Sequence, residues 1–484
     1  MKLFRQPGLW ITFCFVALAA VGFALRARTR NRWGFKDAVK NPGQWASEIQ
    51  RAHQNYVRAI EEAKGWNDAQ VEEAVEHFVF NISSSSEAKL EEKILESLGT
   101  KVQPAIIKIL DDRAKYARLV KPTGTNLLPE APFNRACLVL GNFPPAEAAE
   151  PAIRFLADPS VNIRRDAAGV LGGIGTPAVV KSLRQVMSDS DEYVRSRGLR
   201  SMQWAMQHGR WEKEAARELY ADIAELVVAG KNTDISAQLL MDMNPSGATN
   251  LFLSDRVFNA DAPALHDVLL ALAEQRVNVA RDRLLALISD LESPNRLNPN
   301  SRALAVALRL LGQKQTLEDE GFLKLRTDSP DDIVASGAVN GLIALANLEG
   351  CDQRAWDSLK AHGFSALNPQ QQHFVAVLIF DGEVNNGGLS QYFFNSSGDY
   401  WQEALAGLKT MGSSERLAVL SEAVAKFGKD GPARDRERRQ EQLAKLERKG
   451  DAVFNPLDDR YYKCKEVIYV LAKKFVLNNA DAFK

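Results

Sequence analysis

The fold is decided by the stretch Asp158-Pro-Ser-Val-Asn-Ile-Arg-Arg-Asp-Ala-Ala-Gly-Val-Leu-Gly-Gly-Ile-Gly175. It combines an acidic turn, a helix start with a β-branched residue and an arginine, and an apolar helix. A second copy runs from Ser188 to Met202, and its Val194-Arg195 aligns with Ile163-Arg164 at an offset of 31 residues. Because a helix pair of this size cannot bury its apolar face alone, neighbouring copies must stack. The pattern therefore predicts an α-solenoid.

Weaker copies extend the solenoid over residues 134–348, and they begin near Ile235, Ala264, Arg302 and Ile333. The pattern resembles HEAT-type repeats, closely over residues 134–202 and loosely beyond them. The resemblance implies a concave surface that binds a protein partner. We interpret the repeated arginines as packing and capping groups between repeats.

Composition argues against several kinds of activity. Some proteins with HEAT-type repeats resemble metal-dependent hydroxylases, which need recurring His-Glu pairs, but this chain has no His-Glu dipeptide. Residues 151–350 carry 22 Lys and Arg against 26 Asp and Glu, which disfavours nucleic acid as a ligand of the solenoid. The four cysteines form no CxxC pair, so no zinc or redox site is predicted. We expect no cofactor, no metal and no catalytic residue, and enzymatic activity stays open but disfavoured.

The N-terminus contains an apolar segment, residues 6–25, that has no charged residue. As a helix, these residues would span roughly 30 Å, the thickness of a hydrocarbon core. Lys2 and Arg5 precede the segment, and more positive charge follows it, at Arg26, Arg28, Arg30 and Arg32. Positive-inside reasoning predicts a single-pass membrane protein whose C-terminal bulk is cytoplasmic. The alternative is a signal sequence that is cleaved near residues 17–19 and leads to export.

Two further regions follow from the pattern of apolar residues. Residues 37–120 are predicted to be a helical region, and a loop rich in proline follows them before the solenoid. Residues 352–484 are predicted to be a separate C-terminal helical domain, because the repeats stop and aromatic residues become denser. The predicted fold class is therefore all-α, with an N-terminal membrane helix, a HEAT-like α-solenoid and a C-terminal helical domain.

The C-terminal domain contains the unusual segment Glu383-Val-Asn-Asn-Gly-Gly-Leu-Ser-Gln-Tyr-Phe-Phe-Asn-Ser-Ser-Gly398. Glycine and asparagine tolerate positive φ, so residues 385–388 are expected to turn sharply. The aromatic triplet at residues 392–394 is too large to leave in water. The segment is therefore predicted to be a tight polar loop fixed onto a core, either as a recognition loop or as a helix–helix connection.

Together with Asp458-Asp-Arg-Tyr-Tyr462, this segment resembles a domain family of unknown function that is typified by small bacterial DNA-mimic proteins. The resemblance covers residues 356–482 and implies an all-α fold. It also implies a DNA-binding protein as partner, because the namesake imitates duplex phosphates with an acidic surface. This chain departs from that requirement: residues 352–484 carry 18 Asp and Glu against 19 Lys and Arg.

The resemblance also supplies the candidate ligand-binding or partner-binding residues. Those that match the family motifs are Glu383, Asn385, Asn386, Gly387, Gly388, Gln391, Phe394, Asn395, Asp458 and Tyr462. Each also has a structural interpretation. Glu383 is suited to accept backbone N–H bonds or a ligand cation, the two asparagines are suited to cap helices, and Asp458 is suited to cap the last helix.

Three functional hypotheses follow. The first is a non-catalytic, membrane-tethered scaffold whose solenoid and C-terminal domain bind a protein partner. The second is a small-molecule or enzymatic site around Glu383 and Gln391. The third is a DNA mimic or another regulator related to nucleic acid.

Overall fold

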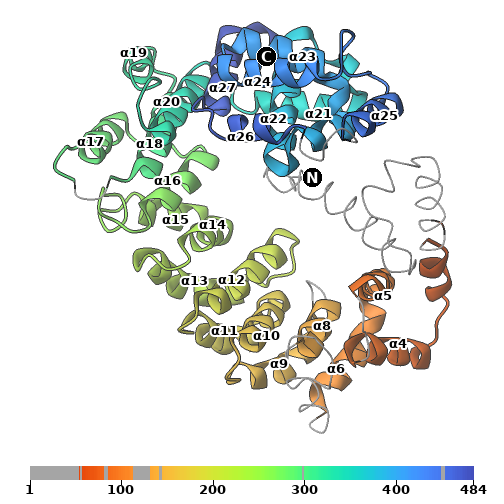
Figure 1. Cartoon of the computed structure of the whole chain (residues 1–484). Coiled ribbons are helices and arrows are strands. Elements are labelled where there is room, and N and C mark those ends of the chain that lie inside the picture. The colour runs from red at the N-terminus through yellow and green to blue at the C-terminus, as the bar shows by residue number, and fades with distance from the viewer. Residues whose placement is uncertain are drawn as a thin grey trace. The chain divides into compact units, whose positions relative to one another are not determined.

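The computed structural model describes residue 54 and residues 57–80, 85–112, 131–140, 144–296, 299–447 and 453–484. Within these ranges every regular element is a helix and no strand is found (Figure 1). The prediction of an all-α chain is therefore confirmed.

The prediction of a single-pass membrane protein is contradicted. In the parts of the chain that the structure describes, no helix is both long enough and apolar enough to cross a membrane. Residues 6–25, on which the prediction rested, lie outside the described ranges. The predicted membrane tether is therefore withdrawn.

The described chain divides into two units, and the boundary falls between Leu272 and Ala273. This boundary lies inside the range predicted for the solenoid, residues 134–348. Repeat helices therefore belong to both units.

The first unit is a stack of helices in two layers. Contacts join α8, α10, α12 and α14 in succession into one layer, and α9, α11 and α13 pair with them as a second layer beside it (Figure 1). Its elements are α4 (Asp68–Phe80), α5 (Ser85–Ser97), η1 (Gly99–Val102), α6 (Gln103–Asp111), α8 (Ala131–Leu140), η2 (Ala146–Ala148), α9 (Ala149–Phe155), α10 (Val161–Ile174), η3 (Pro177–Val179), α11 (Val180–Met187), α12 (Glu192–Gln207), α13 (Lys213–Val228), α14 (Thr233–Met243), α15 (Pro245–Phe252) and most of α16 (Leu265–Glu274).

The repeated arginines connect successive repeats. Arg164 donates to the Asp189 carboxylate at 2.9 Å and to the Asp158 carbonyl at 3.0 Å. Arg195, one repeat later, donates to Asn232 Oδ1 at 2.9 Å and to the Asp189 carbonyl at 2.7 Å. Each arginine therefore binds a carbonyl in the turn before its own helix and a side chain in the corresponding turn of the next repeat. This confirms the interpretation of these arginines as packing and capping groups.

Glycines allow α10 and α12 to approach each other closely. A Cβ atom on Gly172 would lie 2.3 Å from the carbonyl oxygen of Gly198, a distance that no side chain tolerates. Because the contact is backbone against backbone, the two helices have little freedom to shift. The α10–α12 pair is therefore a rigid support for the side chains on its exposed side.

The second unit begins with two more helix pairs and ends in the C-terminal domain (Figure 1). The pairs are α17 (Arg281–Leu291) with α18 (Ser301–Gln313) and α19 (Asp319–Lys324) with α20 (Asp332–Leu345). The remaining elements are α21 (Cys351–His362), η4 (Phe364–Ala366), α22 (Pro369–Phe394), η5 (Ser396–Tyr400), α23 (Trp401–Met411), α24 (Ser414–Ala425), α25 (Arg436–Glu447), α26 (Asn455–Tyr461), α27 (Ile468–Asn478) and η6 (Ala480–Ala482).

Helix α22 runs through the core of the C-terminal domain. It contacts α21, α23, α25, α26 and α27, and its Phe374, Phe380 and Phe393 are fully buried among them. Val470 of α27 packs against Val339 of α20, which joins this domain to the last repeat helix of the same unit. The segment that the sequence singled out therefore lies on the central helix.

Candidate functional site

The predicted tight loop at residues 385–388 is shorter in the structure, where only Gly387 and Gly388 leave helical geometry within the span of α22. The helix begins at an asparagine capping box at Asn368 and leaves helical geometry at Gly387 (φ −162°, ψ 23°) and Gly388 (φ 76°, ψ −177°). A positive φ is nearly free for glycine and costly for other residues. Two helical segments therefore meet at Gly387 and Gly388, which agrees with the predicted helix–helix connection, although the connection is a kink and not a longer loop.

Helix α26 and the residue after it hold the kink from outside. Asp458 accepts the backbone N–H of Leu389 at 2.8 Å, and the Tyr462 hydroxyl donates to the Val384 carbonyl at 2.8 Å. The Tyr461 hydroxyl bonds to Asp381, which lies nearly two turns before the kink. Asp458 thus bonds to α22. The prediction that it caps the last helix is wrong. The Asp-Asp-Arg-Tyr-Tyr motif fastens α26 to α22.

Gly388 is required by its contact with Asp458 as well as by its backbone angle. A Cβ atom there would lie 2.8 Å from Asp458 Oδ2. Burial raises the pKa of Asp458 above its usual value, although the Leu389 N–H opposes that shift. The carboxylate therefore fits against bare backbone, in a position that leaves no space for a side chain.

Glu383 is the hub of a polar cluster that bridges the kink. Its carboxylate accepts from Gln391 Nε2 at 2.8 Å, from Asn395 Nδ2 at 3.0 Å and from the Ser397 hydroxyl at 2.9 Å. A Cβ atom on Gly387 would lie 2.1 Å from Gln391 Oε1, so this glycine leaves space for the amide. Glu383 therefore binds side chains on the far side of the kink rather than backbone N–H groups.

The other candidate residues lie apart from this cluster. Asn385 and Asn386 are exposed, and Asn385 Nδ2 donates to the Asp381 carbonyl at 2.8 Å instead of capping a helix start. Phe394 is buried, whereas Tyr462 exposes 54% of its surface. The structure thus brings Glu383, Gln391 and Asn395 into one cluster and shows structural contacts for most of the set. A ligand-binding role for these residues stays a prediction.

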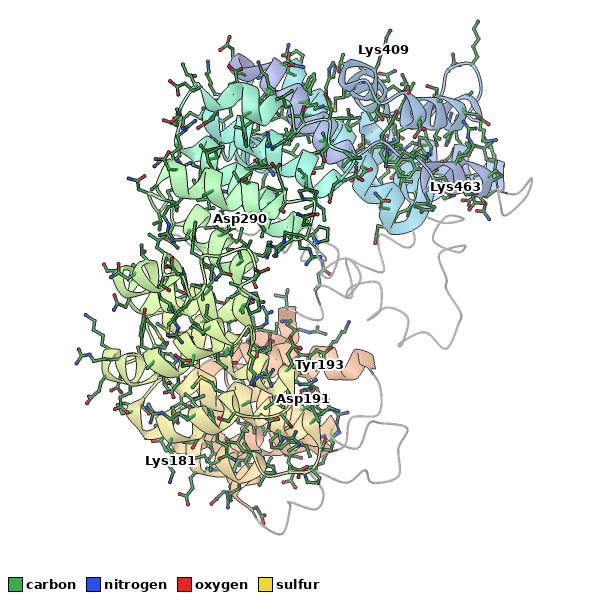
Figure 2. The ribbon with its side chains drawn as sticks, turned by 90° about the vertical axis from the view of Figure 1, so that its left-hand side faces the viewer. Lys181, Asp191, Tyr193, Asp290, Lys409 and Lys463 are labelled. Carbon is green, nitrogen blue, oxygen red and sulfur yellow. The ribbon has the colours of Figure 1, made fainter. Side chains whose placement is uncertain are left out.

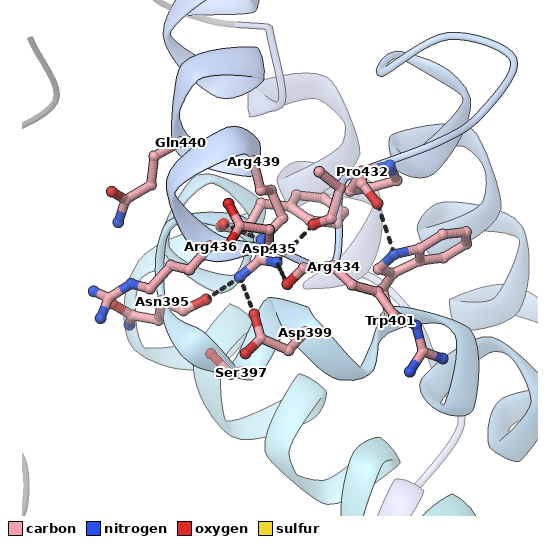
Figure 3. A network of polar contacts seen from close by, with 12 residues as sticks. Asn395, Ser397, Asp399, Trp401, Pro432, Arg434, Asp435, Arg436, Arg439 and Gln440 are labelled. Atoms are coloured by element: carbon pink, nitrogen blue, oxygen red, sulfur yellow. Dashed lines mark hydrogen bonds and ion pairs between the residues drawn. The ribbon is translucent and has the colours of Figure 1, made fainter. Parts of the chain in front are cut away.

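Arg439 of α25 holds the C-terminal end of α22, a role that the sequence did not reveal. Its side chain is fully buried and donates to the carbonyls of Phe393 and Asn395, both at 2.8 Å, and to Asp399 (Figure 3). Gln440 donates to the Phe394 carbonyl at 2.9 Å. The last carbonyls of a helix have no partner within it, and here α25 supplies the partners.

Residues 365–479 match the family model described as DMP19-like protein. Helix α22, the Glu383 cluster and the residues Asp458 and Tyr462 all lie within this match. We call the matched region the DMP19-like domain. Residues 134–203 match the model described as HEAT repeats. Both resemblances predicted from the sequence are therefore confirmed. A search of curated proteins found no match to the chain.

A testable pH dependence arises at Glu466, which caps α24 of the DMP19-like domain. Its carboxylate accepts from the Ser413 hydroxyl and from the Glu415 N–H at 2.8 Å. Burial by itself would raise the pKa of Glu466, but these hydrogen bonds outweigh burial and hold it below its usual value. A carboxylate whose pKa is lower in the folded state than in the unfolded state stabilises the fold at pH values above the unfolded-state pKa. This stabilisation is lost as pH falls through the folded-state pKa.

We expect Glu466→Gln to lower the stability of α24 at pH 7 by about 1 kcal/mol, the typical value of an N-terminal cap. The difference from wild type should shrink as pH falls below the ordinary pKa of a glutamate, about 4.3, and through the lower folded-state pKa of Glu466. Hydrogen exchange of the α24 amides at several pH values measures it. Glu437→Gln, an exposed position on α25, is the control. A difference that does not change with pH would contradict the prediction.

The DMP19-like domain also has a cavity of about 320 Å³ between α22, α23 and α27, lined by Gln370, His373, Thr410, Phe475, Asn478 and Asn479. Burial lowers the pKa of His373, which favours the neutral imidazole. None of the predicted site residues lines this cavity. The cavity and the Glu383 cluster are separate features.

Many acidic side chains of this domain are paired with arginines. Asp399 pairs with Arg439, Glu403 with Arg434 at 2.6 Å, and Glu422 with Arg460 at 2.5 Å, while Arg416 lies 3.5 Å from Asp381. A duplex mimic needs carboxylates that stay exposed at phosphate-like spacing. These ion pairs therefore weigh against mimicry by this domain.

The solenoid presents a different feature, a row of exposed side chains on α12. The row, which we call the α12 face, consists of Tyr193, Arg197, Arg200, Trp204 and Gln207, at spacings of three and four. Such spacings place residues on one side of a helix. Tyr193 exposes 73% of its surface and Trp204 39%, and the Trp204 ring packs against His208 with ring centroids 4.2 Å apart. This face was not predicted from the sequence, although Tyr193 and Trp204 stand at a helical spacing there.

Proposed function

We propose that the chain is a non-catalytic scaffold that binds a protein partner through the α12 face. The observation that supports this most strongly is the exposure of Tyr193 and Trp204 on one rigid helix. Tyrosine, tryptophan and arginine are the residue types that carry most of the binding energy at protein interfaces. Two large aromatic residues in water give a partner much apolar surface to cover.

The packing beneath the α12 face favours binding of a partner without rearrangement of the helix. The close contact of Gly172 with Gly198 and the bonds from Arg164 and Arg195 fix α12 against its neighbours. A surface that is already ordered loses little conformational entropy on binding. The α12 face is therefore a preorganised surface rather than a loop that must fold around its partner.

The rival hypotheses have less support. The hydrogen-bonding groups of Glu383 and Gln391 are turned toward each other, and the cavity lined by His373 lies elsewhere. The DMP19-like domain has nearly balanced charge, and several of its carboxylates are bound by arginines. The domain is more simply a folded unit that accompanies the solenoid than a site of chemistry or a DNA mimic.

The test is affinity capture with the full chain. Immobilised wild type should retain a protein from an extract of the native cells, and Tyr193→Ala combined with Trp204→Ala should retain it at least about thirtyfold more weakly, because each hot-spot truncation costs about 1–2 kcal/mol or more. Lys181→Ala with Lys213→Ala, two exposed positions in the second layer, is the control. Figure 2 shows Lys181 and Tyr193 on different sides of this unit. Equal capture by the aromatic double variant would refute the proposal.

A further inference from the structure

The arginines of the repeats differ in how their charge is compensated. Arg164 has the Asp189 carboxylate at 2.9 Å, Arg184 has Asp222 at 2.9 Å, and Arg200 has Asp234 at 3.1 Å. Arg197 is exposed, and among the described residues it has neither an ion pair nor a hydrogen bond from its side chain. Arg195 donates to the neutral amide oxygen of Asn232. Arg197 is therefore an arginine of α12 whose charge no ion pair within the described residues compensates, whereas Arg200 is paired with Asp234.

The guanidinium of Arg197 is held in a defined place. A Cβ atom on Gly169 of α10 would lie 2.7 Å from Arg197 Nε, so the arginine side chain lies flat against the bare backbone of α10. Tyr193 is one turn before Arg197 on the same side of α12, and Trp204 is two turns after it. This arrangement places a planar cation between two exposed aromatic rings.

We propose that the α12 face binds an acidic segment of the partner protein, with an Asp or Glu carboxylate on Arg197 and apolar side chains on Tyr193 and Trp204. This inference rests on the proposed function. A guanidinium binds a carboxylate through two parallel N–H···O bonds, which makes the contact specific as well as strong. A protein is favoured over nucleic acid because a protein segment brings apolar side chains beside its carboxylates, which suits the exposed Tyr193 and Trp204.

The test uses the full chain with a photo-crosslinker, Tyr193→p-benzoylphenylalanine, irradiated in an extract of the native cells. Mass spectrometry identifies the crosslinked peptides, and Lys181→p-benzoylphenylalanine on the second layer gives the background. We expect the Tyr193 crosslinks to fall in segments richer in Asp and Glu than the background. Adding Arg197→Gln should reduce their yield about tenfold or more, because a charge-assisted pair is lost. Adding Lys181→Gln, which removes a charge elsewhere, should leave the yield unchanged.

The outcomes separate the two proposals. If Tyr193 gives no crosslinks above the Lys181 background, the proposed function itself fails. If protein crosslinks form but their segments are not acidic, or if Arg197→Gln leaves the yield unchanged, the acidic partner is refuted and the scaffold stands. Crosslinks to nuclease-sensitive material would replace the acidic segment with nucleic acid as the ligand of this face.

Discussion

Replacing Arg439 with methionine is expected to destabilise the DMP19-like domain by about 3 kcal/mol. The side chain has no exposed surface, yet it binds the carbonyls of Phe393, Ala433 and Asn395 at 2.8 Å each, as well as Asp399. Methionine fills much of the volume but leaves all of these acceptors without a donor. Buried acceptors that lose their partner cost more free energy than the hydrogen bond contributes when it is formed.

The expected value is at the lower end of the range for a broken buried ion pair because Asp399 is about one-third exposed and water can reach it. Arg439→Lys should recover only part of the loss, since an ammonium cannot reach acceptors on several sides at once. Arg438→Ala, on the exposed side of the same helix, is the control and should change stability by less than about 0.5 kcal/mol.

Hydrogen exchange in the full chain is the appropriate measurement, because a chain of two units need not unfold in one transition. Faster exchange should be confined to the end of α22, to η5 and to α25. If Arg439→Met exchanges no faster than Arg438→Ala, the carbonyls have found other donors, and Arg439 is not what holds α25 to α22.

The sequence predicted the repeats well because their signals are local. An acidic turn and a β-branched residue followed by arginine recur within 31 residues, and the partner of each arginine lies in the next turn. The buried Arg439 could not be predicted in this way. It stands in a run with Arg434, Arg436 and Arg438, and its burial depends on the end of a helix more than 40 residues earlier.

The kink at Gly387 and Gly388 also depends on contacts with residues that are distant in the sequence. Two glycines after two asparagines have the local chemistry of a turn, and the sequence was interpreted accordingly. The two segments on either side of the kink are held by Asp458 and Tyr462, which are 69 and 78 residues away from their partners on α22. The family motifs identified residues that contact one another, and the structure shows the structural contacts that most of them make.

Replacing Gly388 with alanine is expected to destabilise the DMP19-like domain by at least about 2 kcal/mol. A non-glycine residue at φ 76° and ψ −177° is strained by about 1–3 kcal/mol. The new Cβ would also press on Asp458 Oδ2 at 2.8 Å and displace the carboxylate that accepts the Leu389 N–H. The lost bond makes the total cost larger than the backbone strain alone.

Gly382→Ala in the same helix is a matched control that should act in the opposite direction. Gly382 is exposed, and a Cβ there would meet nothing within 4 Å. Alanine should therefore stabilise the helix by about 0.5–1 kcal/mol. Hydrogen exchange of the α22 and α26 amides compares the two variants. Both substitutions add one methyl group to α22. A loss of stability for Gly388→Ala and a gain for Gly382→Ala can therefore come only from the kink and its contact with Asp458. If the two variants change hydrogen exchange equally, neither the positive φ of Gly388 nor its contact with Asp458 is needed for the stability of the domain.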